Sequence, residues 1–97
     1  MACLQDKLPK PALMTVRLVI TLKQSVRRCL YRRWEGQVVG RELRTKTVDL
    51  ERMYRGNTPY PIGKIRQVTR TYPTQAMATR ALGLMTSRRK ALGYRAA

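Results

Sequence analysis

Hydrophobic and polar residues alternate along the first regular stretch of this chain. Val16, Leu18, Ile20 and Leu22 occur at every second position, and most of the residues between them are polar. A period of two is typical of a β-strand with one apolar face. The pattern therefore predicts a strand over residues 15–23.

The next stretch is rich in β-branched and aromatic residues and contains two glycines. It predicts strands over residues 26–34 and 37–43, joined by a tight turn at Glu35-Gly36, where glycine supplies a positive φ. Gly40 is expected to mark a bulge or the close approach of another backbone. Residues 45–54 fit either a strand or a short helix, and Thr45, Thr47 and Val48 favour the strand.

The last third of the chain carries the clearest local signals. Prolines and glycines predict a loop over residues 55–64, followed by a strand over residues 64–72 that Pro73 ends. A helix is predicted over residues 75–92, with Thr74 as N-cap and Gly93 as the C′ residue. Gly83, inside this helix, suggests a close helix–sheet contact. The apolar stripe of the helix consists of Ala78, Ala81, Leu82, Met85 and Leu92.

These elements predict an α+β fold in which a small antiparallel sheet of about four strands is covered on one face by a single C-terminal helix. A length of 97 residues suits one small domain. We expect residues 1–14 to be an extended, basic, proline-containing arm and residues 15–97 to be the domain.

Charge adds a functional expectation. Lys and Arg number 21 against 5 acidic residues, which gives a net charge of +16, and most of the basic residues are arginine. Such a chain repels itself unless a polyanion neutralises it. Nucleic acid is the commonest such partner, and arginine suits bidentate phosphate contacts and stacking. No apolar run is long enough for a membrane span, and we expect no membrane partner.

Catalytic chemistry finds little support in the sequence. The chain has 5 carboxylates and no histidine, so candidates for general acid–base catalysis are few and an ordinary zinc site lacks ligands. Asp49 and Glu51 share a strand face, where we expect them to bond to a neighbouring Arg44, Arg52 or Arg55. We predict a protein that is not an enzyme, with no cofactor, no metal and no small-molecule substrate.

Two basic clusters are the candidate contact surfaces. In the first, arginines alternate with Tyr31 and Trp34, so one exposed face would offer phosphate contact and base stacking. Trp34 fits a core or hairpin-end aromatic equally well. The second cluster lies on the last strand and the helix end. The predicted nucleic-acid-binding residues are Arg27, Arg28, Arg32, Arg33, Trp34, Arg52, Tyr54, Arg55, Lys64, Arg66, Arg70, Arg88, Arg89 and Lys90.

The C-terminal third resembles the end of a WGR domain. The matching residues are Thr71, Tyr72, Pro73, Thr74, Ala78, Ala81, Leu82, Arg88, Arg89, Lys90, Gly93 and Tyr94. The signature Trp-Gly-Arg is absent: Trp34-Glu35-Gly36 lies far from the helix in sequence, and Tyr54-Arg55-Gly56 has the order exchanged. The resemblance implies a sheet packed by one helix and a surface that contacts DNA or RNA. Only Tyr54 and Arg55 could take the roles of the family's DNA-contacting Trp and Arg.

The sequence thus predicts a small basic protein that binds DNA or RNA, through phosphate contacts and some aromatic stacking, as a non-catalytic module or as a subunit of a nucleoprotein assembly. A structural protein of a bacterial or organellar ribosome is one alternative. A small protein that binds a nucleic-acid enzyme, such as a CRISPR effector, is another. The expected location is cytoplasmic and nucleoid- or nucleoprotein-associated, or an organellar matrix.

Overall fold

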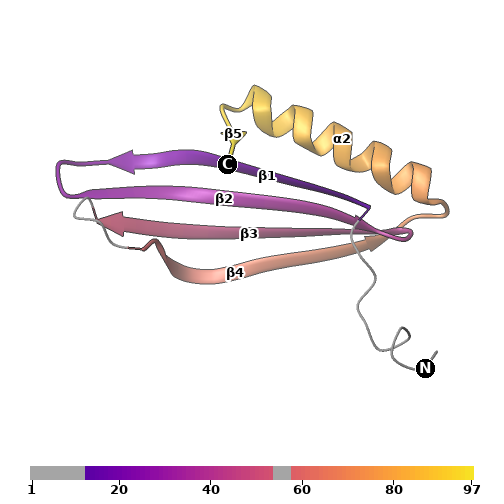
Figure 1. The fold of residues 1–97 in the computed structure, drawn as a ribbon, viewed down its shortest axis with the longest axis horizontal. Coiled ribbons are helices and arrows are strands. Elements are labelled where there is room, and N and C mark those ends of the chain that lie inside the picture. Colours follow the sequence, from indigo (N-terminus) through magenta and orange to yellow (C-terminus); the bar gives the residue numbers. More distant parts are fainter. Residues whose placement is uncertain (1–12, 54–57) are drawn as a thin grey trace, which may run out of the picture.

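The computed structural model describes residues 13–53 and 58–97. In these ranges the chain forms five strands and one helix in the order β1, β2, β3, β4, α2, β5. The strands form one antiparallel sheet in the spatial order β4-β3-β2-β1-β5, and α2 lies along one of its faces (Figure 1). The predicted α+β class and single C-terminal helix are confirmed.

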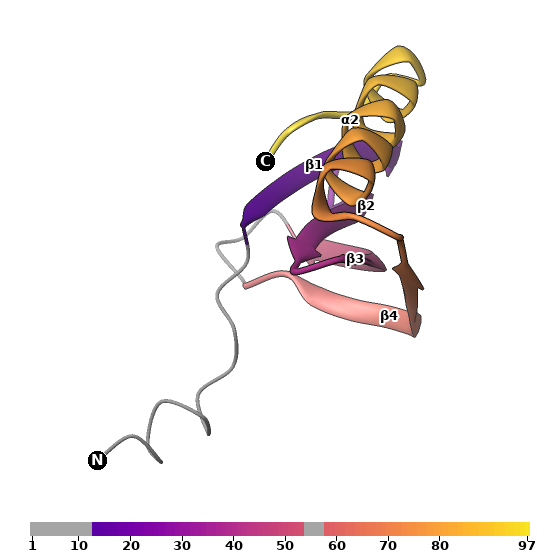
Figure 2. The same cartoon turned by 90° about the vertical axis from the view of Figure 1, so that its right-hand side faces the viewer.

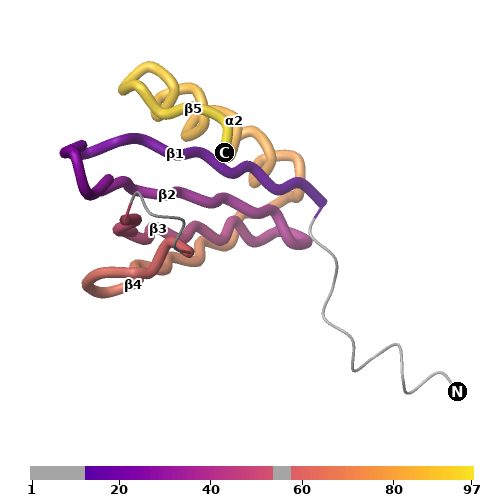
Figure 3. Tube along the Cα trace, turned by 60° about the vertical axis from the view of Figure 1, so that its left-hand side comes forward, coloured from indigo at the N-terminus to yellow at the C-terminus, as the bar shows by residue number. Residues whose placement is uncertain are grey.

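The four long strands have the following bounds: β1 Met14–Gln24, β2 Arg28–Val39, β3 Glu42–Met53 and β4 Tyr60–Thr71. Successive strands pair as neighbours, and the tube view shows them running side by side in a meander (Figure 3). The segment over residues 45–53 is strand, as the β-branched residues indicated. The predicted arm lies, except for its last two residues, outside the described ranges.

The predicted turn at Glu35-Gly36 is wrong. Strand β2 runs through both residues, and the chain instead reverses at Gly40 and Arg41, between the paired residues Val39 and Glu42. Gly40 has φ +61° and Arg41 has a negative φ, as in a type II′ turn with glycine first. The segment predicted as a separate strand, residues 37–43, therefore contributes to the end of β2 and the start of β3.

Gly36 serves the contact between helix and sheet. A Cβ atom added at this position would lie 2.5 Å from Cδ1 of Leu82 and 2.9 Å from Cη2 of Trp34. Glycine therefore lets α2 approach β2 closely. The expectations for Gly40 and Gly83 are corrected accordingly: Gly40 is a turn residue, and a Cβ at Gly83 would meet nothing within 4 Å.

Strand β4 begins earlier than the sequence indicated, because Pro61 and Gly63 are compatible with this position. The strand lies at the edge of the sheet, where a residue without an N–H group is tolerated. Gly63 has φ +74° and lies where the register between β3 and β4 shifts. The prolines and glycines that predicted a loop thus fall partly within an edge strand.

Helix α2, Gln75–Ala91, begins and ends at the predicted signals. The Thr74 hydroxyl accepts a hydrogen bond from the Met77 N–H at 3.2 Å. At the other end, Gly93 has φ +108° and donates to the carbonyl of Lys90, while the Tyr94 N–H donates to that of Arg89. These two bonds form a Schellman motif. They direct the chain into β5, Arg95–Ala96, which pairs with β1.

The core lies between α2 and the β1–β2–β3 part of the sheet. Its buried residues are Leu18, Trp34, Val38, Leu43, Ala78, Leu82 and Tyr94. Leu92, predicted in the helical stripe, is 72% exposed instead. The helix ends one residue before it, and Tyr94 reaches the core after the turn at Gly93.

The end-on view shows α2 above β1 and β2, with β4 on the far side of a curved sheet (Figure 2). The helix packs on β1, β2 and β3, so the β4 side of the same sheet face is left open. In the described ranges, no helix has the length and apolarity that crossing a membrane requires.

Candidate functional site

The open part of the helix-bearing face is a groove between α2 and β4. Its lining residues come from all three of β2, β3 and β4 and from the helix, and it has a volume of about 240 Å³. The lining consists of Trp34, Leu43, Thr45, Thr47, Arg66, Val68, Arg70, Met85 and Arg89. Because of the register between the strands, these β-residues share one face: Thr47 pairs with Arg66, Thr45 with Val68 and Leu43 with Arg70.

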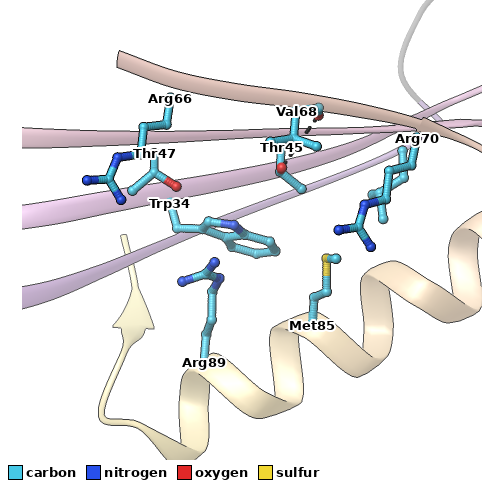
Figure 4. A pocket seen from close by; sticks show the side chains of 9 residues that line it. Trp34, Thr45, Thr47, Arg66, Val68, Arg70, Met85 and Arg89 are labelled. Atoms are coloured by element: carbon cyan, nitrogen blue, oxygen red, sulfur yellow. Dashed lines mark hydrogen bonds between the residues drawn. The ribbon is translucent and has the colours of Figure 1, made fainter. Parts of the chain in front are cut away.

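Three guanidinium groups surround the groove. Arg66 and Arg70 extend from β4, and Arg70 points toward Met85 of α2 (Figure 4). Arg89 extends from the helix on the opposite side and points toward Trp34 (Figure 4). Among the described residues, no carboxylate lines this groove. The local charge is therefore strongly positive, which suits an anionic ligand.

Arg89 is held in place by aromatic rings. Its Cζ lies 4.7 Å from the centroid of the Trp34 ring and 5.4 Å from that of Tyr94. Such cation–π contacts fix the orientation of a guanidinium without neutralising its charge. Arg89 also occupies the position of the helical stripe that follows Ala78, Leu82 and Met85. An arginine at an apolar stripe position was the sequence signal that could have located this site.

Trp34 itself is a core residue. Its side chain is 1% exposed, since α2 covers it, so its ring face is not open to a nucleobase. Of the two interpretations of Trp34, the structure shows the core aromatic. Trp34 is distant from α2 in sequence, but in the fold its side chain lies directly beneath the helix.

Arginines of the first predicted cluster divide into two groups. On the helix-bearing face, Arg32 binds Asp49 through two hydrogen bonds, Nε to Oδ1 at 2.7 Å and Nη2 to Oδ2 at 3.2 Å. Arg28 donates to Glu51 at 3.1 Å. Arg33, on the opposite face of β2, and Arg27, which precedes β2, are exposed. Arg28 and Arg32 hold β2 to β3, and their ion pairs make them less available to an external anion than Arg27 and Arg33 are.

Each carboxylate in the described ranges has an arginine partner. Besides the two pairs above, Arg17 contacts Glu35 at 3.0 Å and Arg44 contacts Glu42 at 3.5 Å. The expected partners of Asp49 and Glu51 are thus corrected, since cross-strand neighbours on β2 bind them. Within the described ranges, no group of three or more Cys, Asp or Glu residues has the geometry to hold a metal ion.

Two pKa shifts follow from these contacts. The hydrogen bonds from Arg32 hold the pKa of Asp49 below its ordinary value of 3.8, and Arg66 adds to the effect. The same pairing raises the pKa of Arg32. A hydrogen bond to Glu51 raises the pKa of the Tyr60 phenol. The lowered pKa of Asp49 and the raised pKa of Arg32 both favour the charged forms of this ion pair.

The second predicted cluster contributes most to the groove. Arg66, Arg70 and Arg89 line it, whereas Lys64, Arg88 and Lys90 are exposed outside it. Arg52 is exposed near the end of β3, and Tyr54 and Arg55 lie outside the described residues. The sequence reasoning missed Thr45, Thr47 and Val68, because their position beside the arginines depends on the register between β3 and β4.

Comparisons with protein families, with curated proteins and with solved structures found no match for this chain.

Proposed function

We propose that this protein is a small, non-catalytic nucleic-acid-binding protein, which acts alone or as a subunit of a larger nucleoprotein assembly. The observation that carries the proposal is the groove between α2 and β4, where Arg66, Arg70 and Arg89 converge and the described lining has no carboxylate. Its ligand is the phosphate backbone of DNA or RNA. The nucleoid, a cytoplasmic nucleoprotein or an organellar matrix is the corresponding location.

Charge distribution supports this proposal. Four arginines are paired with the four described carboxylates, yet the chain as a whole retains a net charge of +16. Counterion release on contact with a polyphosphate is the largest favourable term available to such a protein. The resemblance to the WGR family implies a surface that contacts DNA or RNA, and this implication agrees with the proposed function.

The proposal is tested by the double substitution Arg66→Gln and Arg70→Gln. Both side chains are exposed at an edge strand, so folding should be preserved, as a thermal melt would verify. We expect weaker binding in a fluorescence-anisotropy titration with labelled oligonucleotides. Losing two phosphate contacts should also make the slope of log Kobs against log salt shallower by about 1.4 to 1.8.

A charge-matched control is the pair Arg41→Gln and Arg80→Gln. Arg41 lies in the turn between β2 and β3, Arg80 is exposed on α2, and neither lines the groove. We expect this variant to bind nearly as well as the natural protein. Equal losses in both double variants would mean that binding follows total charge and that the groove has no special role.

The isolated protein also distinguishes the alternative functions. A nucleic-acid-binding module should shift labelled DNA or RNA without any other protein. A ribosomal structural protein, or a protein that binds a nucleic-acid enzyme, should instead co-purify at low salt with ribosomal particles or with a defined protein.

A further inference from the structure

The groove has an apolar patch between its arginines. Val68 lies on β4 between Arg66 and Arg70 and is 49% exposed, and Met85 of α2 also lines the groove. Figure 4 shows Val68 and Met85 bordering the same space. Phosphate is strongly hydrated and gains nothing from apolar neighbours. The groove thus presents a surface for a ligand that carries an apolar group beside its phosphates.

Arg89 offers a second surface of this kind. Its guanidinium is planar and is held against the Trp34 ring at 4.7 Å, and the same side chain lines the groove. A planar guanidinium stacks on nucleobases as well as on aromatic side chains. Because the rings fix Arg89 in advance, little side-chain entropy remains to be lost when a base stacks on it.

The size of the groove limits what it can receive. Its volume of about 240 Å³ lies below the roughly 300–1,000 Å³ of typical small-molecule sites. One nucleotide unit suits such a recess between a helix and a strand.

In a duplex the base faces are stacked on one another and only base edges are accessible in the grooves. An unpaired strand, in contrast, exposes the faces of its bases.

Resting on the proposed function, we infer that the groove receives an unpaired strand of DNA or RNA in preference to a duplex. Phosphates of the strand pair with Arg66 and Arg70. One base lies against Val68 and Met85 and stacks on the guanidinium of Arg89. Thr47 also lines the groove, and its hydroxyl is placed to donate to the sugar or to the base edge. The Thr45 hydroxyl already donates to the Val68 carbonyl at 3.5 Å.

The experiment compares three labelled probes with the full chain by fluorescence anisotropy at one salt concentration. The probes are an oligothymidine, an oligouridine and a mixed-sequence DNA duplex of the same length. We expect at least one single strand to bind at least about tenfold more tightly than the duplex, as stacking of one base provides. Oligothymidine and oligouridine distinguish DNA from RNA, and tighter binding of either supports the inference.

Duplex binding that equals or exceeds single-strand binding would overturn the inference while leaving the proposed function intact. It would point instead to the outer face of α2, where Arg80 and Arg88 are exposed and a helix could enter the major groove. Failure of all three probes to bind would overturn the proposed function, and the inference with it.

Val68→Thr tests the apolar patch directly. The substitution keeps the shape and the β-branching but replaces a methyl group by a hydroxyl at a half-exposed position, so folding is preserved. We expect affinity for the single strand to fall about threefold or more while affinity for the duplex stays unchanged.

The matched control is Thr69→Val, the reverse change at the next residue, which pairs with Arg44 on the opposite face of the sheet. An equal response of both probes to Val68→Thr would overturn the contact with a base.

Discussion

Gly36 lies at the helix–sheet interface, whereas Gly83 does not. Gly36 faces α2 from within β2, and a Cβ there would lie 2.5 Å from Leu82, which is fully buried, and 2.9 Å from the rigid ring of Trp34. Neither neighbour has free space into which to move. Gly83 is on the exposed side of α2, and a Cβ there would meet nothing within 4 Å.

Alanine at these two positions should therefore have effects of opposite sign. We expect Gly36→Ala to lower the free energy of unfolding by about 1–3 kcal/mol through overpacking. Gly83→Ala should raise it by about 1 kcal/mol, because alanine favours the helix more than glycine does. Urea denaturation of the three proteins measures both changes. A stability gain for Gly36→Ala would mean that the helix can move away from β2 at little cost.

The two glycines also show where sequence reasoning reached its limit at the residue scale. A glycine after a polar residue is compatible with a turn, a bulge or a close approach, and the local sequence does not distinguish them. The deciding neighbour of Gly36 is Leu82, which belongs to an element far along the chain. Thr74 and Gly93, whose partners lie within the same helix end, were predicted correctly.

Strands β2 and β3 are joined across the sheet by the ion pair of Arg32 and Asp49. Because Asp49 has a lowered pKa in the folded protein, its charged form stabilises the fold at pH values above its unfolded pKa, near 4. This stabilisation is lost as pH falls through the lower, folded pKa. Both side chains are 35% exposed, so solvent screening keeps the effect modest.

We expect Asp49→Asn to melt at a lower temperature than the natural protein at about pH 7, by about 1 kcal/mol or less in free energy. The difference between the two melting temperatures should be smaller at about pH 2 than at about pH 7, because protonation of Asp49 in the natural protein increases as the pH falls. Thermal melts at both pH values provide the measurement. Glu42→Gln, which removes the longer contact to Arg44, is the control for loss of any carboxylate. A difference that persists unchanged in acid would show that the Arg32–Asp49 charge interaction is not its cause.

At the element scale, the sequence predicted the helix and most of the strand residues, because the period of two and the helical stripe are local. It did not predict the turn at Gly40 or strand β5. It did not predict where α2 lies on the sheet. That position depends on which strand faces offer a continuous apolar surface after pairing, and only β1, β2 and β3 provide one. The groove exists because one helix is narrower than a sheet of four long strands.

The whole molecule has 21 basic and 5 acidic residues, which gives a net charge of +16 on 97 residues. In the described ranges, four carboxylates are each paired with an arginine. The remaining cations lie on both faces of a thin sheet and at the helix end. At low ionic strength their repulsion extends over about 30 Å, and near physiological salt over about 8 Å. The free protein should therefore be least stable in dilute buffer.

Two melting series follow from this repulsion, and they should have slopes of opposite sign. For the free protein, we expect the melting temperature to rise between about 10 mM and 150 mM salt, because screening weakens the repulsion. With a saturating oligonucleotide, the melting temperature should be higher at low salt and should fall as salt rises. The oligonucleotide stabilises the folded protein by binding it, and its affinity declines with salt. Differential scanning fluorimetry measures both series. A free-protein melting temperature that falls with salt would show that the surface ion pairs outweigh the repulsion, and it would remove the energetic reason for a polyanionic partner.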